Sequence, residues 1–419
     1  MEYINEHHHQ RPPSPGVRPI KAKDCIEELL KFTLSSSIDG ALGLDIGLSK
    51  DYCSKLLKDD DGPENPDLAL SMHQNLSQSY RPDPSTSDIA EGISTHPLYK
   101  HLASSLFQSV SVGAFGRPYD RMALMHEDGS LGQKEDEWIE LVMEKGSELL
   151  NVLENVDFKL HVQEPFFSQL KDGVKTVEGR CAVGDYNRIV PGALILFNKC
   201  LVLQVQDVHR YASFLEMLEA ESLTKVLPGV QTIEEGVQIY RKFYSEEKEK
   251  LNGVLAIGVT KPAVQPFISL AGVLSGLSYG GIQRLLGFVN TVGTTAEALP
   301  PPRSTLLSSF LLPHNPNVKG STLTDGARAL AKHVNRSSTK YWGTFNGSDS
   351  TKNRLAKDAI NHLIAHCSWQ NMHFVPPHGV VYEIRTADGY GARWSEDGNE
   401  FIGFLEPYME DGHSNRWKH

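Results

Sequence analysis

The sequence predicts an α+β protein with a small mixed β-barrel in its middle, a helical N-terminal region and a small α+β module at the C-terminal end. Residues 157–262 alternate strand and helix patterns, whereas residues 23–156 carry helical patterns and residues 351–419 combine one helix with strand-like runs. Hydrophobic residues make up 40% and charged residues 22% of the 419 positions. This composition excludes collagen-like and fully disordered chains.

Helical patterns dominate the first third of the chain. Asp24 is a suitable N-cap for the first helix, and amphipathic spacing predicts two more helices at about 98–110 and 136–154. Between the first helix and the helix at about 98–110, residues 59–91 are rich in Asp, Ser, Pro and Gln. Such a composition has few apolar anchors and predicts a flexible linker.

Two further segments lie outside the predicted core elements. Residues 1–22 are polar and proline-rich, which predicts a disordered arm without a secretory signal. Residues 263–350 alternate short helical patterns with proline-rich breaks and predict a connector. Within it, the uncharged stretch 262–283 contains prolines and glutamines, so we expect a buried helical pair and no membrane span.

The middle of the chain has the element order strand, helix, three strands, two helices, strand. Pro165 can start the first helix. Ser213 with Glu216, and Thr232 with Glu235, match the S/T-x-x-E capping box that begins a helix. The strands are expected at residues 158–162, 175–180, 193–197, 201–208 and 253–260.

The net charge of −11 is concentrated at one end of the chain. Residues 1–156 hold 14 basic and 26 acidic side chains, whereas residues 157–262 hold 13 and 14. A near-neutral barrel argues against indiscriminate binding to phosphates and permits recognition in a small cleft. The acidic third suggests an alternative function, an interaction scaffold that binds a basic protein partner in transcription or RNA metabolism.

One motif carries chemistry. Residues 173–180 read G-V-K-T-V-E-G-R, which is the pattern G-x-K-x-x-E-x-R. With this motif, and with residues 209–214, 240–245 and 253–257, the segment 157–262 resembles an ASCH domain (activating-signal-cointegrator homology), a branch of the PUA-like barrels. The whole chain also resembles a plant type of ASCH-domain RNA-binding protein.

The resemblance implies a cleft between barrel and helix, lined by Gly173, Lys175, Glu178 and Arg180. Glu178 and Arg180 are two positions apart, so in a regular strand they share one face and can hold each other in place. Lys175 would then point to the opposite face. Either Lys175 lies in the turn after Gly173, or Gly179 forms a bulge that resets the alternation.

We therefore expect a protein that binds single-stranded or loop RNA, or a nucleotide-like ligand, in this cleft without a cofactor. Binding without turnover is the first expectation. Alternatively, the same cleft cleaves RNA, with Lys175, Glu178 or Tyr186 as the catalytic candidates. A hydrolase acting on acetylated cytidine is a further alternative, although Glu178 stands where such family members have a threonine nucleophile.

Residues 351–419 predict a helix at 352–366 followed by strands at about 372–375, 380–385 and 401–405. His362 and His366 have the i, i+4 spacing of metal ligands, but no metal signature accompanies them, so no metal site is expected. The candidates for a third ligand are His373, Glu383, Asp411 and His413.

Aromatic residues near the C-terminal end allow two interpretations. Tyr390, Arg393 and Trp394 lie among glycines and predict either a surface on which bases stack or a hairpin with an aromatic core. Trp417 is expected to pack against the module. The five cysteines are scattered and include no C-x-x-C pair, which favours reduced thiols in the cytosol or nucleus.

Overall fold

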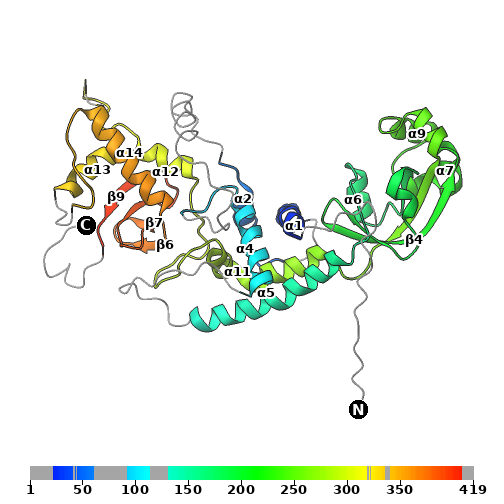
Figure 1. Cartoon of the computed structure of the whole chain (residues 1–419), viewed down its shortest axis with the longest axis horizontal. Coiled ribbons are helices and arrows are strands. Elements are labelled where there is room, and N and C mark those ends of the chain that lie inside the picture. The colour runs from blue at the N-terminus through cyan, green and yellow to red at the C-terminus, as the bar shows by residue number, and fades with distance from the viewer. Residues whose placement is uncertain are drawn as a thin grey trace, which may run out of the picture. The chain divides into compact units, whose positions relative to one another are not determined.

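The computed structural model forms two compact units, made of residues 1–33 with 144–272 and of residues 34–143 with 273–419. Figure 1 labels many of the elements of the two units. The predicted arm, most of the predicted linker and Trp417 lie outside the described part of the chain. The described residues are 22–40, 43, 45–60, 92–113, 131–318, 320, 322–335 and 340–407.

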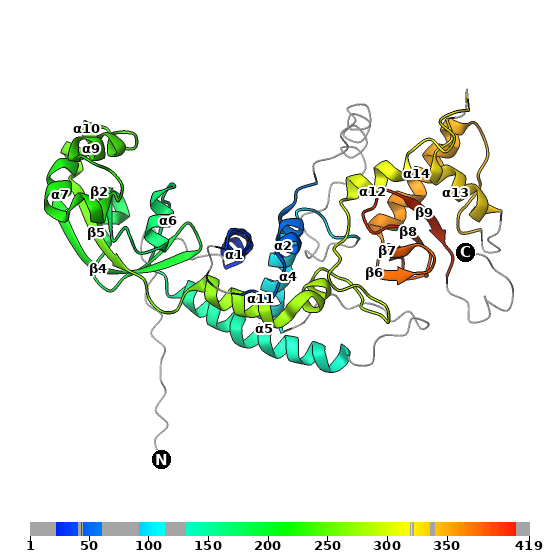
Figure 2. The same cartoon turned by 180° about the vertical axis from the view of Figure 1, so that it is seen from behind.

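A five-stranded sheet forms the centre of the first unit. Its strands run in the order β1-β3-β4-β5-β2, with β1 parallel to β3 and the other pairs antiparallel. β4 is long and is bulged between Val205 and Asp207, and such a bulge increases bending. The sheet therefore curls into a half-barrel with β1 and β2 at its edges, which confirms the predicted class of fold (Figure 2). The strands are β1 (Phe158–Leu160), β2 (Val177–Cys181), β3 (Leu194–Phe197), β4 (Leu201–Tyr211) and β5 (Val254–Thr260).

Helices cover part of this sheet. Both predicted N-caps are present, because Ser213 accepts from the Glu216 amide and Thr232 from the Glu235 amide. The two glutamates accept in turn from the amides of Ala212 and Gln231, which directly precede the caps. Phe214 stacks on Tyr240 with ring centroids 4.1 Å apart, in a core that also contains side chains of β2 and β5. The helical elements are α6 (Phe166–Lys171), η1 (Gly184–Arg188), α7 (Phe214–Glu221), α8 (Leu223–Val226), α9 (Ile233–Arg241) and α10 (Glu246–Asn252).

Gly179 allows β2 to pack closely against this core. A Cβ atom at this position would lie less than 3.0 Å from the Tyr240 hydroxyl and 2.8 Å from Met217 Cε. Gly179→Ala is therefore expected to destabilise the protein by about 1–3 kcal/mol through overpacking, as measured by chemical denaturation. Gly272→Ala is the control, since nothing lies within 4 Å of that site and alanine favours the helix. Equal stability of the two variants would contradict this packing.

The helices outside the half-barrel include one correction. The first helix begins at Ala22, before the predicted cap, and Asp24 lies inside its first turn. The uncharged stretch forms a helix interrupted at Ser278 (φ 52°), so two helical segments result, as predicted. Among the described helices, none has the length and apolar composition needed to cross a membrane. These helices are α1 (Ala22–Ile38), α2 (Lys50–Leu57), α4 (Leu98–Val112), α5 (Leu131–Glu154) and α11 (Pro266–Leu285).

The second unit ends in an antiparallel sheet with the strand order β6-β7-β8-β9. The sequence predicted three of these strands and missed β8, whose glycine-rich surroundings suggested a turn. The strands are β6 (Trp369–Val375), β7 (Gly379–Arg385), β8 (Gly391–Ser395) and β9 (Phe401–Leu405). Three helices precede them: α12 (Arg303–Phe310), α13 (Asp325–Val334) and α14 (Asp349–Ala365).

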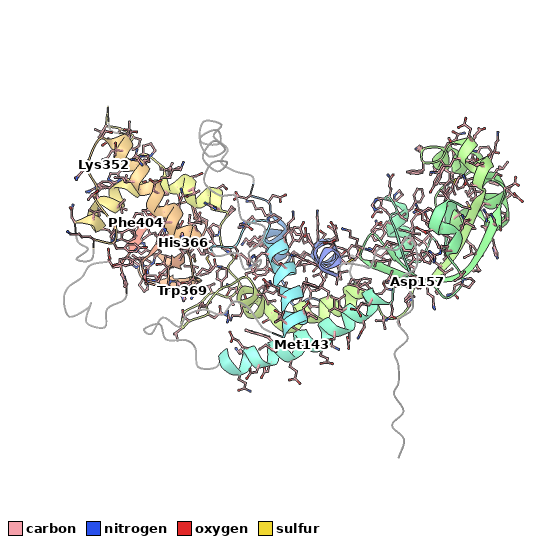
Figure 3. The ribbon with its side chains drawn as sticks, viewed as in Figure 1. Met143, Asp157, Lys352, His366, Trp369 and Phe404 are labelled. Atoms are coloured by element: carbon pink, nitrogen blue, oxygen red, sulfur yellow. The ribbon has the colours of Figure 1, made fainter. Side chains whose placement is uncertain are left out.

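The two faces of this sheet differ in chemistry. Tyr382, Trp394 and Phe404 share the apolar face, and contacts join α12, α13 and α14 to the strands. Trp394 Nε1 donates to the carbonyl of Leu306 in α12. Alternation along the strands places Asn371, His373, Glu383, Arg385 and Arg393 on the opposite face. Figure 3 labels Trp369, which begins β6, and His366, which follows α14.

Candidate functional sites

The G-x-K-x-x-E-x-R motif runs from the end of α6 into the edge strand β2. Gly173 has a φ of +74° and provides the left-handed turn after the helix. The pairing of β2 with β5 is continuous, so Gly179 forms no bulge. Of the two alternatives drawn from the sequence, the structure therefore has the first, with Lys175 in the turn before the strand.

Lys175 points into the interior of the first unit. Its side chain is 1% exposed, and Nζ donates to the carbonyls of Val177, at 2.7 Å, and Val226. Glu178 Oε2 lies 3.1 Å from the same nitrogen. Burial lowers the pKa of Lys175, while Glu178 acts in the opposite direction. All the donors of the ammonium group thus have acceptors within the protein, and none is left for a ligand.

Glu178 and Arg180 share one face of β2 and form an ion pair, with Nε 2.8 Å from Oε1. The Nε hydrogen is not well directed at the carboxylate, so this contact is electrostatic in character. Arg180 Nη2 donates to the carbonyl of His161, at 2.7 Å, just after β1. Arg180 thereby joins the two edges of the half-barrel. Burial alone would lower the pKa of Arg180, but Glu178 and the nearby tyrosines raise it.

Beyond this pair, cations and aromatic rings form what we call the aromatic rim: Arg180, Tyr186, Tyr244 and Lys248. The Arg180 guanidinium carbon lies 5.9 Å from the Tyr186 ring centroid, and Lys248 Nζ lies 5.4 Å from that of Tyr244. Arg180 also interacts electrostatically with Tyr244, whose pKa is raised mainly by burial. Both tyrosines are half-buried and Lys248 is exposed. The sequence indicates Tyr186 as an acid–base candidate and includes Tyr244 only in a segment that resembles the family.

A second group of charged side chains, here called the sheet cluster, consists of His373, Glu383, Arg385 and Arg393. Glu383 is its centre, with a side chain 1% exposed. Its Oε2 lies 3.1 Å from His373 Nε2 and accepts from Arg393 Nε at 2.9 Å and Nη2 at 2.6 Å. Its Oε1 accepts from Arg385 Nε at 2.6 Å. Burial would raise the pKa of Glu383, but Arg385, His373 and Arg393 hold it well below its usual range.

The sequence pattern does not indicate that the residues of the sheet cluster lie together. Glu383 and Arg385 alternate on one strand, and Arg393 pairs directly with Glu383 across β7 and β8. Recognising β8 would have placed these three residues on one face.

The other C-terminal candidates have different surroundings. The rings of His362 and His366 lie 4.2 Å apart, and within the described ranges no group of three metal-ligating side chains occurs. His373 and Glu383 contact each other. Trp394 is fully buried and Tyr390 stacks on Tyr341. The interpretation of this segment as a surface on which bases stack is therefore wrong for Trp394.

Comparisons with known proteins match two parts of the chain. The family model of the ASCH domain matches residues 160–263, and the model of the CdiA C-terminal tRNase toxin domain matches residues 313–406. The crystal structure of hypothetical protein PH0355 is 42% identical, covering 25% of this chain and 98% of that one, with a TM-score of 0.25. The solution structure of protein PF0455 from Pyrococcus furiosus is 44% identical, with coverages of 26% and 98% and a TM-score of 0.24. No curated protein matches the chain.

Proposed function

The chain belongs to the ASCH-domain proteins through residues 160–263, and we propose that it binds RNA with this PUA-like domain. The observation that carries the proposal is the aromatic rim, where Arg180 is held between Glu178 and the carbonyl of His161 beside half-buried tyrosines. Aromatic rings stack on unpaired bases, and a fixed guanidinium can stack on a base or pair with a phosphate. Single strands and loops expose bases in this way.

The four motif residues contribute differently to this proposal. Lys175 neutralises and positions Glu178, which in turn orients Arg180. Gly173 provides the turn that brings Lys175 inside. Arg180 is the motif residue we propose to touch RNA. Because few cations take part, binding should depend only weakly on salt concentration.

Removing two rim side chains tests the RNA-binding proposal. The double variant Tyr186→Ala, Lys248→Ala is expected to bind a single-stranded RNA about 10-fold more weakly or worse, since stacking contributes about 1–3 kcal/mol per base. Fluorescence anisotropy of the full chain measures the Kd. Lys250→Ala is the matched control, because Lys250 lies on the same helix as Lys248 and is exposed. Unchanged affinity of the double variant would refute the placement of the site.

A second function, RNA cleavage, is supported by the second unit. The matched model describes a tRNase toxin domain, and its match covers the sheet cluster with its acid–base and cationic side chains. The motif of the ASCH domain is less suited to catalysis, since Lys175 has no free donor and Glu178 is held between two cations. We therefore propose the C-terminal sheet, rather than the ASCH cleft, as the place of any cleavage.

A further inference from the structure

We infer that His373 and Arg393 form a catalytic site for RNA phosphodiesters, with Glu383 and Arg385 as positioning residues. The inference rests on the proposed RNA cleavage and assigns its residues and chemistry. His373 and Arg393 are the more exposed members of the sheet cluster, at 14% and 15% of their side chains, against 9% for Arg385 and 1% for Glu383. The first two are thus the groups that a substrate on this face can reach.

Glu383 determines which nitrogen of His373 is available. An ionised carboxylate only accepts hydrogen bonds, so His373 Nε2, 3.1 Å from Oε2, carries the hydrogen. Nδ1 is then the basic nitrogen of the neutral ring, and it has no hydrogen-bond partner among the described residues. A carboxylate that fixes the tautomer and the orientation of an imidazole is a recurring arrangement in proton-transfer sites. His373 Nδ1 is therefore suited to take a proton from a substrate.

Glu383 itself is a poor candidate for the base. Its two oxygens accept from Arg385, from Arg393 and from His373, and its side chain has almost no exposed surface. A proton on this carboxylate would remove the negative charge that all three partners contact. Its contribution is to hold His373 and Arg393 next to each other, since both contact the same oxygen, Oε2.

The two arginines are also distinct. Arg385 Nη1 donates to the carbonyls of Gly389, at 2.6 Å, and Glu406, at 3.0 Å, so Arg385 is tied to the backbone at the end of the sheet. Arg393 uses Nε and Nη2 on Glu383, and its Nη1 has no partner within the described part of the chain. Arg393 is thus an oriented cation with a free donor, as the charge on a reacting phosphate requires.

Trp369 gives independent support for a polar ligand on this face. It lies two positions before Asn371 on β6, and its ring is edge-on to His373 with centroids 6.1 Å apart. Its Nε1 is buried and has no hydrogen-bond partner among the described residues. An unpaired buried donor costs free energy, and an acceptor on a bound nucleotide would remove that cost once the groups that cover Nε1 move aside.

The proposed step uses the 2′-hydroxyl of RNA. His373 Nδ1 takes the 2′-hydroxyl proton, the 2′-oxygen forms a bond to the adjacent phosphorus, and the bond from phosphorus to the 5′-oxygen breaks. The leaving 5′-oxygen takes a proton from water, and the imidazolium later returns its proton to water. Arg393 stabilises the negative charge on the non-bridging oxygens. The products are a 2′,3′-cyclic phosphate and a 5′-hydroxyl end, and DNA is not a substrate.

The test uses the full chain with transfer RNA and with a labelled RNA that carries a single 2′-deoxy nucleotide, in the presence of EDTA. We expect the wild type to produce cyclic phosphate ends and to spare the deoxy position. His373→Gln should lose about 100-fold or more in kcat, and Arg393→Ala a similar factor. His378→Gln is the matched control, because His378 is an exposed histidine in the turn between β6 and β7.

The roles of the positioning residues need a separate measurement. Glu383→Gln should lower kcat and leave KM nearly unchanged, whereas a variant that merely unfolds loses both activity and its melting transition.

Equal cleavage by wild type and His373→Gln, cleavage of DNA, or no cleavage by the wild type would each overturn the inference. RNA binding is measured in parallel by anisotropy. Binding without cleavage refutes this site alone, and unchanged RNA affinity of the Tyr186→Ala, Lys248→Ala variant refutes the proposed role of the aromatic rim.

Discussion

Glu178→Gln is expected to lower the free energy of unfolding by about 3–5 kcal/mol, because the substitution leaves a buried ammonium group without its counter-charge. The Lys175 side chain is 1% exposed and that of Glu178 is 8% exposed, so water cannot replace the lost carboxylate. Burial lowers the pKa of Lys175 below its usual 10.5. When the pKa of a lysine is lower in the folded than in the unfolded protein, the free energy of unfolding rises as the pH increases toward the unfolded pKa of 10.5. The loss in the variant should therefore shrink in alkaline solution.

Chemical denaturation across a pH series measures this effect. Lys175→Met in the Glu178→Gln background should recover part of the lost stability, since the uncompensated charge is then absent. Glu219→Gln is the control, because Glu219 is an exposed glutamate in α7 of the same unit. A loss below about 1 kcal/mol for Glu178→Gln, typical of exposed ion pairs, would contradict the buried network.

The second large effect is an acid sensitivity centred on Glu383. Its pKa is held below the usual 4.5 by Arg385, His373 and Arg393, against the effect of burial. A carboxylate with a lowered pKa contributes stability that is complete above 4.5 and is lost as the pH falls below it. We therefore expect the melting temperature of the second unit to fall in this acidic range, as measured by thermal unfolding.

Glu383→Gln separates this contribution from general acid denaturation. At neutral pH this substitution should lower the free energy of unfolding by about 3–5 kcal/mol, because three cationic or donor groups lose a buried charged partner. Below pH 4.5 the difference in the free energy of unfolding between Glu383→Gln and the wild type should become smaller. Glu400→Gln, at an exposed position just before β9, is the control. A constant difference between wild type and Glu383→Gln across the acidic range would contradict the assigned role.

The half-barrel was predictable because local signals coincide with its elements. Runs of apolar residues on either side of the polar Asn198-Lys199 pair define β3 and β4, and the two S/T-x-x-E patterns give the starts of α7 and α9. The ion pair of Glu178 with Arg180 follows from strand alternation alone. Each of these features depends only on residues that are close in the sequence, so the pattern of a single sequence is enough to predict it.

The remaining features depend on contacts between distant residues. Lys175 is buried because the carbonyl of Val226, in α8, accepts from it, and no pattern near residue 175 indicates this. The sheet cluster similarly needs the register of three strands, including the unpredicted β8. The plant-type resemblance, the cytosolic or nuclear location and the partner of the acidic N-terminal region stay predictions.

Ultraviolet crosslinking of the full chain to RNA, with mass spectrometry of the crosslinked peptides, tests the central claim most directly. The His373→Gln variant keeps the RNA intact during the measurement. The account predicts crosslinks at Tyr186 or Tyr244 in the aromatic rim. It also predicts crosslinks at Trp369 or at the adjacent residues of the sheet cluster. Crosslinks confined to residues outside 160–263 and 313–406, or none above those of an equally acidic control protein, would contradict it.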